Sequence, residues 1–225
     1  PIVPGYLGDQ DAARLADESL YLDTDGKLHP EIIAARRDIM RAAGKANIYS
    51  AHLPTTLGGG GLGRTDMIYV EEKVYGYGCG LNPALLSWSE GATPRLLYCH
   101  DHQREQFVDP LVRGEKTSLH AVTEAGAGSN LFDMKTHAKK RGSDWVLNGH
   151  KAYITNAFDA DVVQVLAVTQ PGGGRKSFTY FMFDAREMLV VSRHMGNGRN
   201  PAWGVLNQSL DRAKDLPVPA AVKVA

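Results

Sequence analysis

The spacing of apolar residues changes near residue 115, and this change predicts two structural parts. In the first part apolar residues recur at helical spacing, which predicts helices at about 31–46, 65–76, 83–98 and 101–114. Pro30 and Gly44 stand near the ends of the first of these helices, and Thr65 is an acceptable N-cap for the second. The N-terminal part, residues 1–115, is therefore expected to be an all-α domain.

The second part, residues 116–225, has the short alternating segments of a β domain. Segments rich in Val, Thr and aromatic residues predict strands at 118–123, 134–140, 145–147, 152–155, 162–169, 178–183 and 189–193. Asn148-Gly149 is a strong hairpin signal, and Pro171 to Gly174 predicts a flexible turn. Residues 206–217 have a charged, helix-like pattern instead. The chain is thus expected to be an α+β multidomain protein, its second domain a small antiparallel β-barrel or sandwich.

Composition narrows the classes of function. The 225 residues include 25 basic and 25 acidic side chains, and this neutral balance argues against a nucleic-acid partner. No apolar run is long enough to span a membrane. Two cysteines, Cys79 and Cys99, are too few for a disulfide framework or a zinc site, and His100 and His102 have no metal-binding context. We expect no metal and a reducing compartment, the cytoplasm or, in a eukaryote, the mitochondrial matrix.

Two segments carry the candidate chemistry. Residues 120–130 read His-Ala-Val-Thr-Glu-Ala-Gly-Ala-Gly-Ser-Asn, and residues 148–156 read Asn-Gly-His-Lys-Ala-Tyr-Ile-Thr-Asn. The small residues of the first segment allow a backbone to approach a flat or charged ligand closely. The glycines at 126 and 128 lack the third glycine of a dinucleotide fingerprint, and those at 58–63 lack the Gly-Lys-Ser/Thr of a P-loop. We expect two strands that bring Thr, Ser and an aromatic ring to one bound group.

Together these segments resemble the flavin-binding motifs of the acyl-CoA dehydrogenases. That family carries Thr-Glu-x-Gly-Ala-Gly-Ser-Asp followed by Asn-Gly-x-Lys-x-Trp-Ile-Thr-Asn. This chain matches both, with Asn130 for the usual acid and Tyr153 for the usual Trp. The resemblance implies FAD as cofactor, an N-terminal helical domain, a middle β domain, and a C-terminal four-helix domain that is not present in residues 1–225.

The same resemblance assigns the candidate cofactor-binding residues. They are His120, Ala121, Val122, Thr123, Gly128, Ser129, Tyr153, Ile154 and Thr155. Thr123, with the backbone of Ala121 and Val122, is expected at the pyrimidine side of the flavin, where donors stabilise developing negative charge. Ser129 is expected at the pyrophosphate and at the substrate's pantetheine channel. Tyr153 is expected against the ring system, and Thr155 near flavin N5.

The implied reaction is α,β-dehydrogenation of an acyl-CoA thioester with hydride transfer to FAD N5. The family's catalytic base is a Glu of the C-terminal domain, so no catalytic residue is assigned here, and Glu124 is rejected as the base. Implied partners are the acyl-CoA substrate, an electron-transferring flavoprotein or other acceptor, and further copies in a dimer or homotetramer, within fatty acid metabolism. The alternatives are a partner-completed subunit, a flavin oxidase or monooxygenase, and a non-catalytic binding module.

Overall fold

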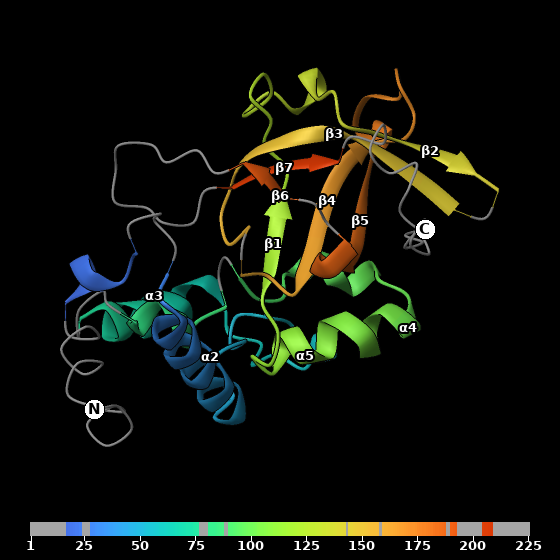
Figure 1. Ribbon diagram of the computed structural model, residues 1–225. Helices are drawn as coiled ribbons and strands as arrows, with labels where there is room; N and C mark the ends of the chain where they lie inside the picture. The colour runs from blue at the N-terminus through green and yellow to red at the C-terminus, as the bar shows by residue number, and fades with distance from the viewer. Residues whose placement is uncertain are drawn as a thin grey trace. The chain divides into compact units, whose positions relative to one another are not determined.

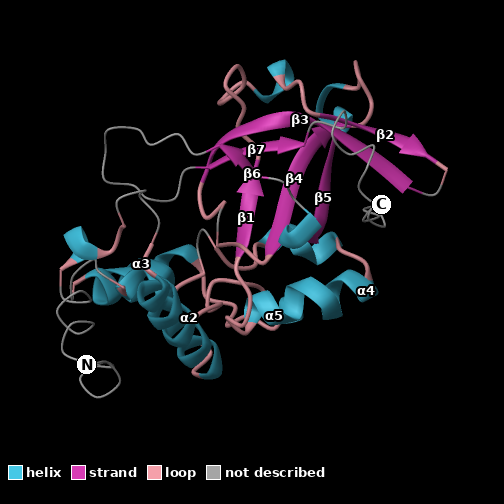
Figure 2. Ribbon diagram, in the orientation of Figure 1, coloured by secondary structure: helices cyan, strands magenta, loops and turns pink. Residues whose placement is uncertain are grey.

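The computed structural model describes residues 17–23, 28–76, 81–87, 90–142, 144–157, 159–187, 190–192 and 204–208. The chain divides into two compact units. The first comprises Pro1–Tyr98 and Arg104–Glu115, and the second comprises Cys99–Gln103 and Lys116–Ala225. Helices make up the first unit and strands dominate the second, as Figure 2 shows by colour. The expected succession of an all-α part and a β part is confirmed.

The first unit contains two longer helices and several short ones. Its elements are η1 (Glu18–Leu20), α2 (Pro30–Lys45), η2 (Thr55–Leu57), α3 (Arg64–Tyr75), η3 (Asn82–Leu85), η4 (Pro94–Tyr98), the π-helical turn η5 (Arg104–Val108) and α5 (Asp109–Val112). Before η5 the chain passes through α4 (Asp101–Gln103), so residues 101–112 form one helical stretch, close to the predicted one.

Two predictions about the helices are wrong. The expected helix at 83–98 is broken into η3 and η4, because Leu86 has extended backbone and the Ser87 amide donates to the Tyr49 carbonyl at 2.9 Å. The second helix begins at Arg64 rather than after a Thr65 cap. The Asp66 carboxylate accepts from the Gly63 amide at 3.1 Å, and this contact makes Gly63 the N-cap, two residues before Thr65.

Packing in the first unit follows the helical spacing of the sequence. Three buried residues of α2 form one cluster with residues of the following segments: Ile39, Met40, Ala43, Tyr49 and Ala84. A second cluster joins α3 to its neighbours through Ala51, Met67, Val74 and Leu86. Burial of such aliphatic side chains stabilises a domain by ~1.5–3 kcal/mol each. Most of the helical stability therefore comes from these apolar faces rather than from helix propensity.

The second unit is built around one mixed sheet. Its strands are β1 (Ser118–Ala121), β2 (His137–Arg141), β3 (Asp144–Ile154), β4 (Val162–Val168), β5 (Phe178–Asp184), β6 (Val190–Ser192) and β7 (Gly204–Gln208). The strand order is β1-β4-β2-β3-β7-β6, with β5 also paired to β4. Figure 1 shows β4 between β1 and β5, with the β2–β3 hairpin extending beyond them.

The sheet differs from the expected antiparallel barrel or sandwich in two respects. Among the described residues it does not close on itself, and β4 pairs in parallel with β1 and, through one residue pair, with β2. Parallel pairing arises because the β2–β3 hairpin lies between β1 and β4 in the sequence, so the chain re-enters the sheet in its original direction. Residues 204–208 form β7, so the expected helix beginning near 206 is wrong for its first three residues; the rest lies outside the described residues.

Asn148-Gly149 does not form the hairpin turn that its sequence signals. Both residues lie inside β3, which runs unbroken from Asp144 to Ile154, and the β2–β3 turn contains Gly142 at φ 62° instead. Gly149 is required for another reason, because a methyl group there would lie 2.5 Å from the Thr136 Cα atom. The glycine thus permits close contact between neighbouring strands.

Candidate functional site

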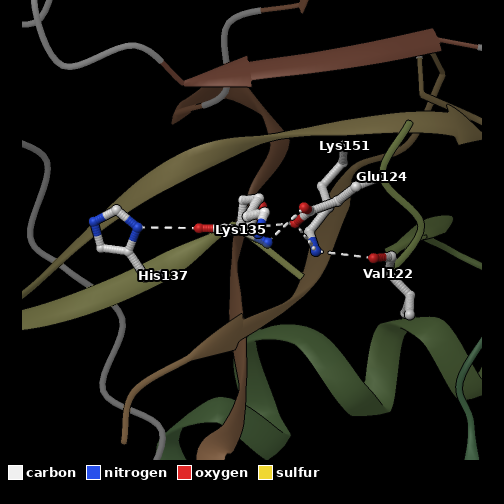
Figure 3. A network of polar contacts seen from close by, with 6 residues as sticks. Val122, Glu124, Lys135, His137 and Lys151 are labelled. Atoms are coloured by element: carbon white, nitrogen blue, oxygen red, sulfur yellow. Dashed lines mark hydrogen bonds and ion pairs between the residues drawn. The ribbon is translucent and has the colours of Figure 1, made fainter. Parts of the chain in front are cut away.

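A buried ion pair joins the two segments that the sequence singled out. Lys151 of β3 is 1% exposed, and its Nζ atom lies 3.1 Å from the Glu124 Oε1 atom. The same Nζ donates to the Val122 carbonyl oxygen at 2.9 Å. Glu124 also accepts from the backbone amides of Lys135, at 2.7 Å, and Thr136, at 2.8 Å. Figure 3 shows the Glu124 carboxylate between these donors, so a single carboxylate connects three segments of the chain.

The end of β1 explains why these contacts form. The registered pairing of β1 with β4 stops at Ala121, so Val122 and Thr123 continue beyond the ladder. Buried backbone carbonyls require partners, and here β3 supplies them. Lys151 binds the Val122 carbonyl, and the Ala152 amide donates to the Thr123 carbonyl at 2.9 Å. Consecutive residues of β3 therefore hold consecutive residues of the first segment.

The charge states of the pair follow from these contacts. Burial opposes ionisation of Glu124, but hydrogen bonds from Thr136, the Lys135 amide and Lys151 hold the pKa of the carboxyl below its ordinary value. Burial lowers the pKa of Lys151, and the neighbouring carboxylate opposes that shift. Hydrogen bonds to charged groups are stronger than neutral ones. Glu124 is therefore an ionised structural carboxylate with its oxygens already bound.

Beyond Glu124 the first segment turns outward. Glu124 and Ala127 exchange backbone hydrogen bonds of 2.9 and 3.1 Å, which close a tight turn. Gly128 and Ser129 after this turn are exposed, and a Cβ atom on Gly128 would have nothing within 4 Å. Asn130 then caps η6 (Leu131–Asp133): its side chain accepts from the Phe132 amide at 3.2 Å. An amide at position 130 thus serves the same capping role that a carboxylate would.

The second segment also turns outward at its end. Tyr153 is 53% exposed and has φ 61°, a conformation that costs an aromatic residue ~1–3 kcal/mol. It falls where the register between β3 and β7 shifts, between Lys151 and Ile154. Thr155 follows as an exposed residue, and Asn156, at φ 63°, is anchored by its amide on the Ser118 carbonyl at 3.2 Å. The strained bulge therefore presents a phenol ring and a hydroxyl at the surface of the unit.

The candidate residues thus divide by burial. The side chains of Ala121 and Ile154 lie in the core cluster formed with β4 and β5, so only their backbone is available to a ligand. The half-buried ones are His120, Val122 and Thr123, and the exposed ones are Gly128, Ser129, Tyr153 and Thr155. The hydrogen bonds that join the two segments hold Val122 and Thr123, but within the described residues they do not include Ser129 or Thr155.

Lys151 was missed as a functional residue in the sequence. It stands between His150 and Ala152 in a strand of half-exposed residues, where a lysine is normally solvated. A signal was nevertheless present, because Lys151 and Glu124 each occupy a fixed place in one of the two motifs. A buried charge needs a partner, and the acid of one motif is the obvious partner for the base of the other.

Metal binding and membrane insertion have no support in the described residues. They contain no group of three or more His, Cys, Asp and Glu side chains that could hold a metal ion. In the same part of the chain, no helix combines the length and apolar character needed to cross a membrane. His100 and His102 stack on one another, with ring centroids 5.6 Å apart.

Comparison with known proteins identifies both units. The model of the acyl-CoA dehydrogenase N-terminal domain matches residues 12–115, and that of the acyl-CoA dehydrogenase middle domain matches residues 120–205. A 3-(aryl)acrylate reductase of Clostridium sporogenes is 31% identical over 153 residues, which cover 67% of this chain and 40% of that protein. The mitochondrial long-chain specific acyl-CoA dehydrogenase of Sus scrofa is 37% identical over 135 residues, which cover 59% of this chain and 31% of that protein.

Solved structures show the same fold. An acyl-CoA dehydrogenase of Bacillus anthracis, solved in complex with FAD, matches 92% of this chain and 37% of its own with a TM-score of 0.64 and 22% identity. The chain spans less than half the length of the curated relatives named above.

Proposed function

Because the chain belongs to the acyl-CoA dehydrogenase family, we propose that it binds FAD and serves an oxidoreductase that dehydrogenates an acyl-CoA thioester between Cα and Cβ. The observation that carries this proposal is the junction of the two motif segments. Lys151 and Ala152 of the second segment hold Val122 and Thr123 of the first. Exposed hydroxyl and aromatic groups stand at the outer ends of both segments.

The residues present fit a flavin nucleotide. Ser129 and Gly128 are exposed beside a turn with open space around the glycine, which suits a pyrophosphate approached by backbone and hydroxyl donors. Tyr153 is a half-exposed aromatic residue in a strained conformation, which is typical of a functional position. Stacking on such a ring contributes ~0.5–1.5 kcal/mol beyond burial.

Each group of the chain then has a stated task. Val122 and Thr123, with His120 and Ala121 before them, are proposed to border the pyrimidine edge of the ring system. Ser129 is proposed to donate to the pyrophosphate and to border the substrate's pantetheine arm. Thr155, next to Ile154, is proposed to donate near N5. When bound, FAD supplies the acceptor for the hydride that leaves the substrate's Cβ.

Removal of the Cα proton needs a base with a free carboxylate or amine. Glu124 does not meet this need, because Lys151 and two backbone amides occupy its oxygens and it is 7% exposed. Its contacts are those of a structural residue. We therefore propose that the base comes from a helical segment outside residues 1–225, as the family resemblance implies.

Partners follow from the same proposal. Reduced cofactor must pass its electrons on, so we propose an electron-transferring flavoprotein or a comparable acceptor. Homo-oligomers, dimer or tetramer, are proposed for the protein at its full natural length. A place in fatty acid metabolism and a matrix or cytoplasmic location belong to this proposal as well.

The proposed function is tested with the protein purified at its full natural length. We expect a yellow protein that releases FAD on denaturation and is bleached by an acyl-CoA without oxygen. Thr155→Ala removes one hydroxyl from an exposed position, so stability is expected to stay unchanged while FAD affinity falls about fivefold, equivalent to one hydrogen bond. Slower flavin reduction by acyl-CoA is the accompanying effect.

The outcomes separate the alternatives. A colourless protein that takes up no FAD contradicts the proposal as a whole. A Thr155→Ala variant with unchanged FAD affinity and unchanged reduction kinetics contradicts the role proposed for Thr155. Bleaching by a nitroalkane alone indicates the oxidase alternative, and FAD binding without bleaching by any substrate indicates a binding module. Because one relative is named a reductase and another a dehydrogenase, the reaction is assayed in both directions.

A further inference from the structure

We infer that Lys151, held by Glu124, is a positioning residue that fixes the Val122–Thr123 backbone for the cofactor. This inference rests on the proposed function of the site. It concerns a residue that would act through its neighbours, since Lys151 is buried and its cation is already engaged by two oxygens.

The first argument comes from what the two lysine contacts connect. The Glu124 contact alone would only compensate the charge of the buried lysine. The Val122 contact does something different, because it holds a backbone carbonyl at a place where β1 has left its ladder. Together with the bond from the Ala152 amide to Thr123, it sets the position of two consecutive peptide groups. Peptide groups at the edge of a binding site need such support to keep their geometry.

A second argument comes from the cost of the arrangement. A lysine placed in a buried position loses its hydration, and the lowered pKa of Lys151 reflects that burial. Replacing a buried ion pair by apolar residues of similar volume is often neutral or stabilising. A pair that was only structural would therefore be replaceable. The donor to Val122 is the part of the arrangement that an apolar pair does not reproduce.

A third argument comes from the other end of the carboxylate. Glu124 accepts from the amides of Lys135 and Thr136, just before β2, and the His137 ring nitrogen bonds the Lys135 carbonyl at 3.1 Å. Figure 3 shows this chain of contacts continuing from Val122 to His137. The lysine is therefore braced against the start of β2 and is not free to follow the loop that it holds.

The test compares three variants of the full natural protein. Lys151→Met removes the cation at similar length. The double variant Glu124→Gln with Lys151→Met leaves no unpaired buried charge, which should restore much of the stability without restoring the donor to Val122. Phe181→Leu is the control: Phe181 is buried in the same unit, in a cluster with Ala138 and Ala167 that contains none of the candidate residues.

Three quantities are measured well below the lowest melting temperature. They are the dissociation constant for FAD, the midpoint potential of bound FAD at saturation, and the hydrogen exchange of the Ala152 amide in the cofactor-free protein. We expect both Lys151 variants to bind FAD about tenfold more weakly, to show a more negative potential and to exchange the Ala152 amide faster. Phe181→Leu, at a comparable loss of stability, is expected to bind FAD as the unmodified protein does.

The possible failures are distinguishable. If the unmodified protein binds no FAD, the proposed function falls and the positioning role falls with it. If it binds FAD, and the double variant recovers stability together with FAD affinity and potential, then only the inference is overturned. The inference is also overturned if Lys151→Met and Phe181→Leu weaken FAD binding equally. It is overturned as well if the Ala152 amide of the Lys151 variants exchanges as slowly as in the unmodified protein. Should Lys151→Met alone not fold, the double variant decides.

Discussion

The buried and exposed halves of the two motif segments differ in what their side chains contact. Glu124 and Lys151 are enclosed and bind each other and the backbone around them. Ser129, Tyr153 and Thr155 are exposed at the outer ends of the same segments. A short motif therefore contains two kinds of residue, those that hold the segments together and those that remain accessible to a ligand.

This difference shows that a residue can lie near the candidate site without being available to act on a ligand. Glu124 lies next to Thr123, yet its oxygens are committed to Lys151 and to two amides. Tyr153 lies two residues from Lys151, yet its ring is accessible. Mutations of the buried residues are expected to affect folding more than ligand binding. Mutations of the exposed residues are expected to affect ligand binding more than folding.

The largest effect is expected from removing the carboxylate in Glu124→Gln. Breaking one member of a buried pair costs ~3–5 kcal/mol in general. The folded state lowers the pKa of Glu124 below the ordinary 4.5, so its stabilisation is present above that pH and is lost as pH falls through the folded-state value. Urea unfolding of the unmodified protein and of Glu124→Gln should therefore show a large difference in the free energy of unfolding at pH 7, and this difference should shrink below about pH 4.5.

Comparing Glu124→Gln with the unmodified protein also controls for the titration of other carboxylates. Asp184 and Glu115 also have lowered pKa values, but they contribute equally to both proteins. A stability difference that stays constant from pH 7 to pH 3 would contradict an ionised Glu124.

An intermediate effect is expected from Gly149→Ala. The added methyl group would lie 2.5 Å from the Thr136 Cα atom, so the strand must shift. Overpacking of this kind costs ~1–3 kcal/mol. Because Thr136 donates to Glu124, weaker FAD binding should accompany the loss. Gly142→Ala serves as the comparison for denaturant unfolding and FAD titration, because at φ 62° with open space around it the added methyl group strains the backbone without a clash. Equal FAD affinity in the two variants would show that the Thr136 contact is only structural.

The smallest effect on stability is expected from Tyr153→Gly. Relief of the positive φ offsets the entropy cost of glycine, so the free energy of unfolding should change by less than about 1 kcal/mol. FAD affinity should nevertheless fall about threefold to tenfold through lost stacking, whereas Tyr153→Trp should increase it. Loss of stability in Tyr153→Gly with unchanged FAD affinity would place Tyr153 among the structural residues.

Much of the fold was predictable from local sequence. The helices at 30–45 and 64–75 and most strands of the second unit match their predicted ranges within a few residues, because burial of one face imposes a local period on the residues of an element. The two motif segments were also recognisable from sequence. Their exposed members, Ser129 and Thr155, remain predictions as ligand contacts.

Other features were decided only by contacts between distant residues. Asn148-Gly149 has the local signal of a turn, yet it forms strand because Asn148 pairs with His137 of β2 and Gly149 pairs with Gln208 of β7. Lys151 has the local signal of a solvated residue, yet it is buried because Glu124, 27 positions away, lies against it. Backbone preferences of ~1 kcal/mol are weaker than the strand pairing and charge pairing that oppose them. The sequence thus specified which segments meet, and tertiary packing decided which side chains bind each other and which face outward.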